Sequence, residues 1–206
     1  MAIPSSASSR ARLVVATLNA AKGAELAQLL EDGVPFQVVT LGALRPDAVP
    51  PAETGASYAE NALLKARAAA ALTGDLTLAD DSGLEVDALG GGPGIHSARY
   101  GGPGLSDAER TRQLLGALEG VESSRRTARF RCVIALVEPG GREQLAEGVV
   151  EGIIAHAPRG TAGFGYDPVF IYPPLGRTFG ELSDVEKAKV SHRGRAIAAA
   201  RRLLGG

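Results

Sequence analysis

Residues 128–155 read ARFRCVIALVEPGGREQLAEGVVEGIIA, and this stretch decides the fold. The run 128–137 is apolar at odd and even positions alike, which is typical of a central strand covered on both faces. Glu138-Pro-Gly-Gly141 predicts a tight turn, and residues 143–155 return as the partner strand. Since a hairpin pairs its strands antiparallel, the sheet must be at least partly antiparallel.

Strand and helix signals alternate on both sides of this hairpin. Further strands are predicted over 12–16, 36–41, 76–79 and 168–172, with another apolar piece at 84–89. Helices are predicted from about residue 21 to 30, over 57–73 with Gly74 ending it, over 106–118 and over 191–204. Ser-x-x-Glu capping boxes begin at Ser57, Ser106 and Ser183. This interleaving predicts an α/β fold with a mixed sheet flanked by helices.

The composition is that of a globular protein and excludes several functional classes. The 206 residues carry 22 Lys and Arg against 23 Asp and Glu, so a nucleic-acid coat or a basic membrane-surface protein is excluded. The single cysteine, Cys132, rules out an internal disulfide framework, suits a reducing compartment and is expected to be buried. No segment looks like a signal peptide or a membrane span. We therefore expect a cytoplasmic protein with a flexible tail at 1–10 and one domain over 11–206.

Familiar nucleotide and metal motifs are missing from the sequence. There is no GxxxxGK[ST] loop and no strand-linked GxGxxG, so neither P-loop nor Rossmann binding is supported. Three His and one Cys exclude a Cys-rich zinc site. A metal would have to be held by carboxylates, which favours a hard ion such as Mg²⁺.

Two candidate sites precede predicted helices. In Thr17-Leu-Asn-Ala-Ala-Lys22, free N–H groups at a helix N-terminus and the Lys22 charge would suit a phosphate, although a capping Asn19 followed by a solvated lysine is the simpler interpretation of the spacing alone. Glu53 lies outside the capped helix that carries Lys65, so capping does not explain it. A loop glutamate of this kind is ordinarily solvated.

Asp80-Asp81-Ser82-Gly83 follows the strand predicted at 76–79. Adjacent strand side chains point to opposite faces, so one aspartate is expected to bond locally while the other faces a cleft. Ligands of α/β proteins bind at strand ends, but an aspartate-rich turn is the alternative.

Two further candidates lie in the C-terminal third. In Gly163-Phe-Gly-Tyr-Asp-Pro168, glycines flank Phe164, so the backbone could approach a flat ligand that stacks on the ring. Lys187 and the pair His192-Arg193 lie at a helix entry and offer donors for phosphates or base carbonyls. Each of these patterns alone also fits an ordinary turn with solvated charges.

Taken together, the five segments resemble the inosine/xanthosine triphosphate pyrophosphatase family. The resemblance covers residues 13–204 and rests on LVVATLNAAK, ETGASYAENALLKA, LADDSGLEVDALGGGPGIHSARYGG, GFGYDPVF and ELSDVEKAKVSHRG. One position departs from the family pattern, because Leu18 stands where the family usually has glycine. Three of the four lysines, Lys22, Lys65 and Lys187, fall within these segments.

The resemblance implies an elongated, two-lobed subunit with a central cleft, acting as a homodimer. It implies Mg²⁺-dependent hydrolysis of ITP, dITP or XTP to the monophosphate and pyrophosphate, with no nucleic acid or membrane as partner. Glu53 and Asp81 would serve the metal, and Asp81 would also act as the base. The residues implied to bind substrate are Thr17, Leu18, Asn19, Ala20, Ala21, Lys22, Lys65, Ser82, Phe164, Gly165, Tyr166, Asp167, Lys187, His192 and Arg193.

Two other functional classes remain alternatives. A different Mg²⁺-dependent phosphohydrolase could act through an aspartyl-phosphate at Asp80 or Asp81, although the DxD spacing of that chemistry is missing. A non-catalytic RNA-binding module could use the arginine cluster Arg125, Arg126, Arg129 and Arg131. Turnover of ITP without nucleic acid would separate the three.

Overall fold

The computed structural model describes residues 10–31 and 33–205, so most of the tail expected at 1–10 lies outside the described residues. The strands within these ranges are β1 (Arg12–Val15), β2 (Gln37–Thr40), β3 (Leu76–Val86), β4 (Thr127–Val137), β5 (Glu143–Ile154), β6 (Phe170–Tyr172) and β7 (Arg177–Thr178). The α-helices are α1 (Ala20–Leu30), α2 (Leu41–Leu44), α3 (Tyr58–Thr73), α4 (Asp107–Ala117), α5 (Asp184–Val190) and α6 (His192–Leu203).

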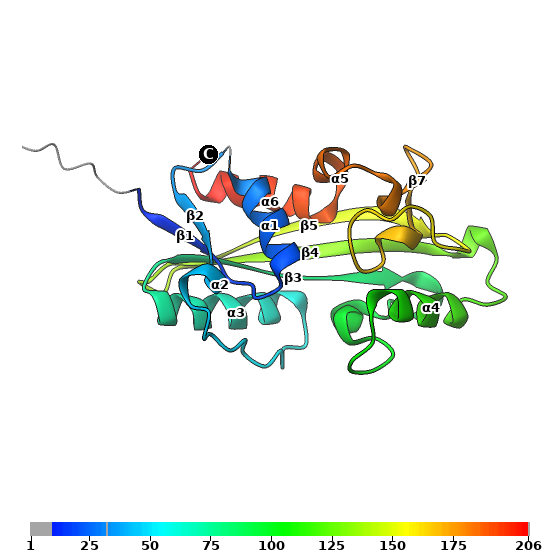
Figure 1. Ribbon diagram of the computed structural model, residues 1–206, viewed down its shortest axis with the longest axis horizontal. Coiled ribbons are helices and arrows are strands. Elements are labelled where there is room, and N and C mark those ends of the chain that lie inside the picture. Colours follow the sequence, from blue (N-terminus) through cyan, green and yellow to red (C-terminus); the bar gives the residue numbers. More distant parts are fainter. Residues whose placement is uncertain (1–9, 32, 206) are drawn as a thin grey trace, which may run out of the picture.

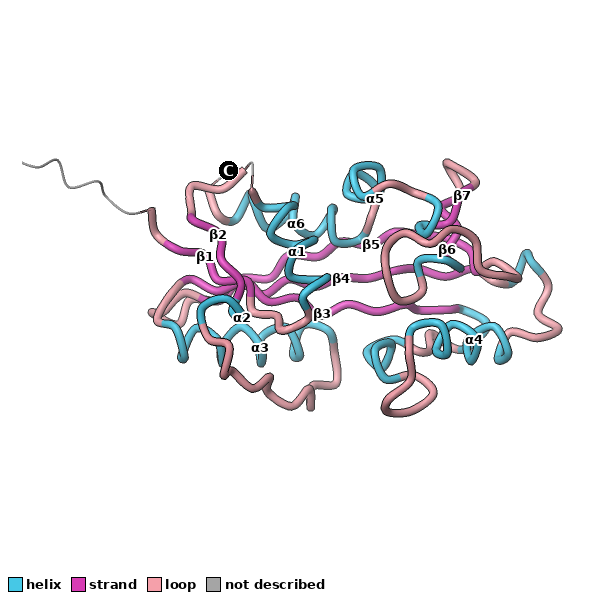
Figure 2. The backbone as a smooth tube through the Cα atoms, in the orientation of Figure 1, coloured by secondary structure: helices cyan, strands magenta, loops and turns pink. Residues whose placement is uncertain are grey.

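The strands form one mixed sheet in the order β2-β1-β3-β4-β5-β6-β7. The β1 strand pairs parallel with both β2 and β3, and all other neighbours are antiparallel. The hairpin of β4 and β5 stays in register from Val137↔Glu143 to Thr127↔Ile153. The mixed sheet predicted from this hairpin is therefore confirmed, and its three long strands run along an elongated molecule (Figures 1 and 2).

The predicted strand end at Asp80 is wrong, because β3 continues without a break to Val86. The long β4 strand supplies partners along the whole stretch, from Thr77↔Val137 to Val86↔Ala128. The β1 strand, in contrast, pairs only with residues 76–78 of β3. Beyond Leu78 this edge of β3 faces the loop that follows β1, until a bridge joins Glu85 to Pro93. Asp80, Asp81 and Ser82 thus lie within β3, beyond the point where β1 stops pairing with it.

Helices cover both faces of the sheet. The α1, α5 and α6 helices lie on one face, and α3 lies on the other (Figure 1). Alternate residues of the same strands supply separate cores, because neighbouring side chains point to opposite faces. Leu78 and Ile134 pack in the α1–α6 core, whereas Ala79 and Ala135 pack in the alanine-rich core under α3. A third core fills the far end of the sheet and contains Leu84, Leu114, Phe130, Phe170 and Phe179.

The predicted helix boundaries are largely confirmed. The capping boxes at Ser106 and Ser183 are both formed. At Ser57 the hydroxyl accepts from the Glu60 N–H, but the Glu60 carboxylate accepts from the Ala56 N–H rather than from that of Ser57. Gly74 ends α3 with a φ of 71°, a left-handed conformation that favours glycine.

The short elements at the sheet margins were not predicted. The helix α2 and the strand β7 carry too few residues to show a period, and the strand expected over 168–172 forms only over Phe170–Tyr172. Cys132 is buried, as expected. No helix within the described residues is long and apolar enough to cross a membrane.

Candidate active site

The loop after β1 presents the N-terminus of α1 to the cleft. Asn19 caps the helix, since its side-chain oxygen accepts from the Lys22 N–H at 3.0 Å. The Thr17 hydroxyl accepts from the Asn19 N–H at 3.2 Å and shapes the preceding turn. Ala20 and Ala21 occupy the first turn, and Leu18 is 40% exposed. Capping and phosphate binding, which were alternatives for this segment, are compatible, because the cap leaves the Lys22 ammonium beside the helix N-terminus.

The two adjacent aspartates of β3 face opposite sides of the sheet, as strand alternation predicts. Asp80 is 2% exposed, and its carboxylate lies 2.8 Å from the Lys22 ammonium and 3.8 Å from Arg193 Nε. Asp81 is 6% exposed and lies 2.9 Å from Lys65 Nζ, with the Asn61 amide donating to it at 3.3 Å. Asp80 therefore holds two cations in place, whereas Asp81 belongs to a separate polar group.

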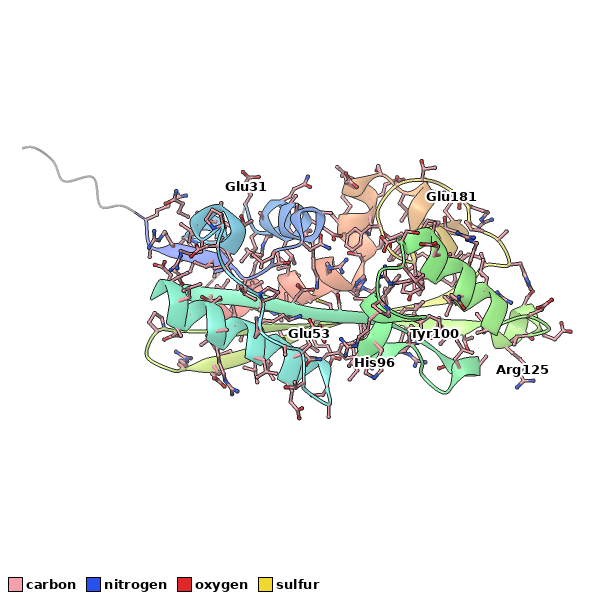
Figure 3. All side chains as sticks on the ribbon, turned by 60° about the horizontal axis from the view of Figure 1, so that its bottom comes forward. Glu31, Glu53, His96, Tyr100, Arg125 and Glu181 are labelled. Carbon is pink, nitrogen blue, oxygen red and sulfur yellow. The ribbon has the colours of Figure 1, made fainter. Side chains whose placement is uncertain are left out.

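Glu53, Lys65 and Asp81 form that group. The Lys65 ammonium lies 2.9 Å from both the Glu53 and the Asp81 carboxylate, so it joins a loop glutamate to a strand aspartate. Arg99 reaches the other oxygen of Glu53 at 3.2 Å. Glu53 precedes α3 on the side of the molecule that also carries His96 and Tyr100 (Figure 3). The interpretation of Glu53 as a solvated loop residue is thereby excluded.

Burial and charge act in opposite directions on these carboxylates. Burial raises the pKa of Asp81, and the nearby Glu53 carboxylate acts in the same direction, against the Lys65 charge. Burial would also raise the pKa of Glu53, but the surrounding Lys and Arg cations outweigh it and the pKa is lowered. A carboxylate with a raised pKa is a stronger base than an ordinary aspartate, and is better suited to accepting a proton.

The carboxylate pair fits a divalent cation only in combination with a ligand. No cluster of three or more His, Cys, Asp or Glu side chains suited to a metal occurs among residues 10–31 and 33–205. Glu53 and Asp81 supply two carboxylates, and Mg²⁺ is commonly held by one or two carboxylates together with substrate phosphates. The donor set is therefore compatible with a cation that arrives with a polyphosphate.

The loop Gly163–Asp167 forms the aromatic wall of the site. The Asp167 carboxylate accepts from the Phe164 N–H at 2.9 Å and lies 2.7 Å from the Lys187 ammonium. Two cations lie against the Phe164 ring, with Lys187 Nζ 5.0 Å and the Arg193 guanidinium carbon 4.8 Å from its centroid. Gly163 has a φ of 73°, and a Cβ there would come within 2.1 Å of Asp167. Asp167 thus positions the loop and Lys187, which spacing alone could not show.

His192 and Arg193 begin α6 and lie under this wall. His192 is 2% exposed and stacks on Phe130, with ring centroids 4.6 Å apart. Burial, together with the neighbouring cations, holds the pKa of His192 well below its ordinary value, so the imidazole is neutral. Arg193 donates to the Ser82 hydroxyl at 3.0 Å and to Glu25 at 3.1 Å. Tyr166 is buried and donates its hydroxyl hydrogen to the Ser97 carbonyl.

Two adjoining cavities collect most of the predicted site residues. The first cavity has a volume of about 350 Å³. The predicted site residues that line it are Asn19, Lys22, Ser82, Phe164, Gly165, Tyr166, Asp167, His192 and Arg193. The second cavity has a volume of about 310 Å³. The predicted site residues that line it are Thr17, Leu18, Asn19, Lys22, Glu53 and Lys65. Asn19 and Lys22 line both, so the cavities meet at the start of α1. Ala21 and Lys187 line a neighbouring groove between α1 and α5 instead.

Sequence reasoning missed several polar residues of the site. Asn61 supports Asp81, Glu25 pairs with Arg193, and Arg110 lines the first cavity. Glu25 and Asn61 lie on the helices that carry Lys22 and Lys65, four residues or fewer away in sequence, and this helical spacing was the available signal. Arg110 gave no signal, because an arginine on an exposed helix is ordinary.

The arginine cluster considered for RNA binding is neutralised or buried. Arg126 is 3% exposed and donates to three backbone carbonyls. Arg129 and Arg131 form ion pairs across the strands with a group of acidic side chains, Glu85, Asp87, Glu147 and Glu151. Arg125 lies apart, near one end of the molecule (Figure 3). The cluster therefore offers no continuous basic face.

The cleft of this α/β fold combines lysines and a carboxylate pair with an aromatic-walled cavity. This combination defines an enzyme that binds nucleotides and hydrolyses their phosphates. The chain belongs to the Ham1 family, whose model matches residues 13–203. The resemblance drawn from the sequence is thereby confirmed.

Known relatives are similar over nearly the whole chain. A protein of Symbiobacterium thermophilum named dITP/XTP pyrophosphatase is 54% identical over 190 residues, which cover 92% of this chain and 93% of that protein. A protein of the same name from Desulforamulus reducens is 50% identical over 193 residues, covering 94% and 95%. A solved HAM1 protein from Coxiella burnetii is 43% identical and superposes with a TM-score of 0.85 over 95% of this chain and 98% of its own.

Proposed function

We propose that this chain hydrolyses nonstandard purine nucleoside triphosphates, namely ITP, dITP and XTP, to the monophosphate and pyrophosphate. The observation that carries the proposal is the Lys65 ammonium held between Glu53 and Asp81, with Lys65 and Glu53 lining the second cavity. The second cavity contains groups that suit phosphates, namely Thr17, Lys22 and Lys65, and the first cavity has the aromatic wall formed by Phe164. The names of the relatives support the same substrate class.

The phosphate end is formed by the loop Thr17–Lys22 and Lys65. Free N–H groups of the first turn of α1 and the two ammonium groups stabilise the charge that develops on the leaving pyrophosphate. Glu53 and Asp81 would hold a divalent cation, which we take to be Mg²⁺ and which supplies further charge neutralisation at the phosphate oxygens. Leu18 in place of glycine needs no left-handed backbone, since no non-glycine residue among those the structure describes has a positive φ.

Asp81 is the proposed general base. It takes a proton from the attacking water while the water oxygen bonds to the α-phosphorus and the bond from that phosphorus to the bridging oxygen breaks. Its raised pKa suits this role, and Asn61 and Lys65 hold the carboxylate in one orientation. Pyrophosphate leaves with the bonding electron pair.

The base end selects a purine with a 6-carbonyl. Phe164 offers its face to the base, and Arg193 offers guanidinium donors that suit a carbonyl acceptor but oppose the 6-amino group of adenine. Sites built around such a donor can discriminate by up to about 10⁴. Ser82, Tyr166, Asp167, Lys187 and His192 shape this end of the site. The enzyme is expected to prefer ITP to ATP in kcat/KM.

The cellular setting is part of the same proposal. We infer a cytoplasmic homodimer whose subunit has a single domain of two lobes over residues 11–206 and whose partner is the small-molecule substrate rather than nucleic acid or membrane. The ion-paired state of Arg129 and Arg131 supports the exclusion of nucleic acid. The elongated sheet with separate cores at its two ends supports two lobes.

A panel of nucleotides tests the function and the cleavage position together. Wild-type protein is incubated with ITP, dITP, XTP, GTP and ATP and Mg²⁺, and pyrophosphate and orthophosphate are detected separately. We expect pyrophosphate with the matching monophosphate from ITP, dITP and XTP. Orthophosphate with a diphosphate product would contradict the proposal, as would equal kcat/KM for ATP and ITP. Trapping of a phosphorylated aspartate would favour the other phosphohydrolase class.

A further inference from the structure

The aromatic-walled cavity contains a cation whose hydrogen-bonding capacity is only partly used. Arg110 lies on α4 and Arg193 lies on α6, and both side chains line this cavity. The Arg110 Nε is fully buried, and no described residue accepts a hydrogen bond from it. A buried N–H without a partner is costly, so such a group calls for an explanation.

Arg110 is held in a defined position. Its Nη1 lies 3.3 Å from Asp107 Oδ1, while the other oxygen of Asp107 accepts from the Gly165 N–H at 2.8 Å. The Thr111 hydroxyl also reaches the Gly165 carbonyl, at 3.4 Å. The first turns of α4 therefore fix both the guanidinium and the loop that carries Phe164. A donor fixed in this way is prepared for a ligand.

The cavity consequently has donor groups from two helices, α4 and α6. A base stacked on Phe164, with its 6-carbonyl toward Arg193, has one further exocyclic position on its six-membered ring, at C2. Hypoxanthine carries hydrogen there, xanthine carries a carbonyl acceptor and guanine carries an amino donor. An N–H donor from α4 that reaches this position would bond to xanthine, leave hypoxanthine unaffected and oppose guanine.

We propose that Arg110 reads the 2-position of the purine, favouring xanthine and disfavouring guanine. This inference rests on the proposed function and deepens it, because it supplies the discrimination against GTP that Arg193 cannot provide. GTP shares the 6-carbonyl of ITP, so a group that recognises only that carbonyl accepts both nucleotides.

The test compares Arg110→Met with wild type on ITP, XTP and GTP. Methionine keeps much of the apolar stem and removes all donors. We expect kcat/KM for XTP to fall about 10-fold or more, the scale of one hydrogen bond to a charged group, while that for ITP changes less than about 2-fold. The ratio of GTP to ITP should rise. Arg112→Met, on the same helix but exposed, is the matched control and should change none of these ratios.

A binding measurement separates recognition from turnover and from misfolding. Titration calorimetry with XMP and IMP on the folded variants, checked by thermal melts, should show weaker XMP binding in Arg110→Met and unchanged IMP binding. Equal losses of kcat/KM for ITP, XTP and GTP would mean that Arg110 contacts the ribose or the phosphates, and the inference would be overturned. Unchanged ratios would overturn it as well. If wild type releases no pyrophosphate from ITP or XTP, the proposed function itself fails.

Discussion

Asp80 and Asp81 are neighbours in sequence with different partners, and substitution separates their roles. Asp81→Asn keeps the shape of the side chain, and Lys65 keeps Glu53 as a partner. We expect kcat for ITP to fall by roughly 10²–10⁴, the scale of a lost general base, with little change in the thermal melt. Pyrophosphate release and calorimetry measure the two effects. Near-normal turnover of the purified variant would remove Asp81 from the base role.

The matching substitution Asp80→Asn should act mainly on stability. It leaves Lys22 without its carboxylate partner in a site where Asp80 is 2% exposed, although Arg193 keeps Glu25. Breaking a buried ion pair from one side costs on the order of 3 kcal/mol. Urea unfolding should show a lower midpoint with an unchanged slope. An unaltered midpoint would mean that the Lys22–Asp80 pair adds nothing to folding.

His192 makes folding sensitive to mild acid. The unfolded chain protonates this imidazole near its ordinary pKa of 6.5, while in the folded chain burial holds the pKa well below that value. Below pH 6.5 the unfolded state therefore binds more protons, and stability falls with decreasing pH by up to about 1.4 kcal/mol per unit. Urea midpoints at pH 7.5, 6.5 and 5.5 should show this slope. His192→Phe, which retains a ring against Phe130, should flatten it, whereas His156→Gln at an exposed position should not.

At the scale of elements, the approach of α6 to the sheet depends on Gly148 of β5. A Cβ at this position would come within 2.1 Å of the His192 carbonyl and 2.4 Å of the Ala196 nitrogen, both backbone atoms. Gly148→Ala must therefore displace the helix that carries His192 and Arg193. We expect a loss of about 3 kcal/mol in unfolding free energy, at the upper end of overpacking effects, and a reduced preference for ITP over ATP.

Gly116→Ala is the control for this substitution. Gly116 lies in α4 with open space around its Cβ position and an ordinary φ, so alanine there should stabilise the protein by up to about 1 kcal/mol. Opposite signs for the two variants in urea unfolding would confirm that close approach, rather than glycine content, decides the effect.

The elements predicted from the sequence are those with a strong local signal. The hairpin of β4 and β5, the capped helices and the mixed sheet are confirmed. The continuity of β3 was not predictable, because Asp80-Asp81-Ser82-Gly83 has the composition of a turn and only the long partner β4 keeps it extended. The site is also only partly predictable from the sequence. The resemblance identified Lys65 and Glu53, but the contacts of Lys65 with Glu53 and Asp81 depend on how α3 packs across β3.

At the scale of the whole molecule, the cleft results from unequal strand lengths. The β1 strand pairs with β3 only as far as Leu78, while β3 continues for eight more residues beside β4. The loop after β1 and the start of α1 therefore lie against the exposed edge of β3, where Asp80 and Asp81 point to opposite faces. Binding groups from both faces, Lys22 and Arg193 on one and Lys65 and Glu53 on the other, can thus reach one substrate.

This arrangement predicts how metal and nucleotide affect the stability of the whole chain. Two carboxylates already bridged by Lys65 make a weak site for a free cation, so a chelator should abolish turnover yet shift the thermal melt by less than about 1 °C. With Mg²⁺ and a nonhydrolysable ITP analogue at 100 times its dissociation constant, linkage adds about 2.7 kcal/mol. For a chain of this size that corresponds to a rise of roughly 5–10 °C. The analogue with chelator should give a much smaller rise, because the triphosphate then meets Glu53 and Asp81 without a cation between them. A large shift with Mg²⁺ alone would instead indicate a preformed metal site, and the coupling of metal to substrate would be wrong.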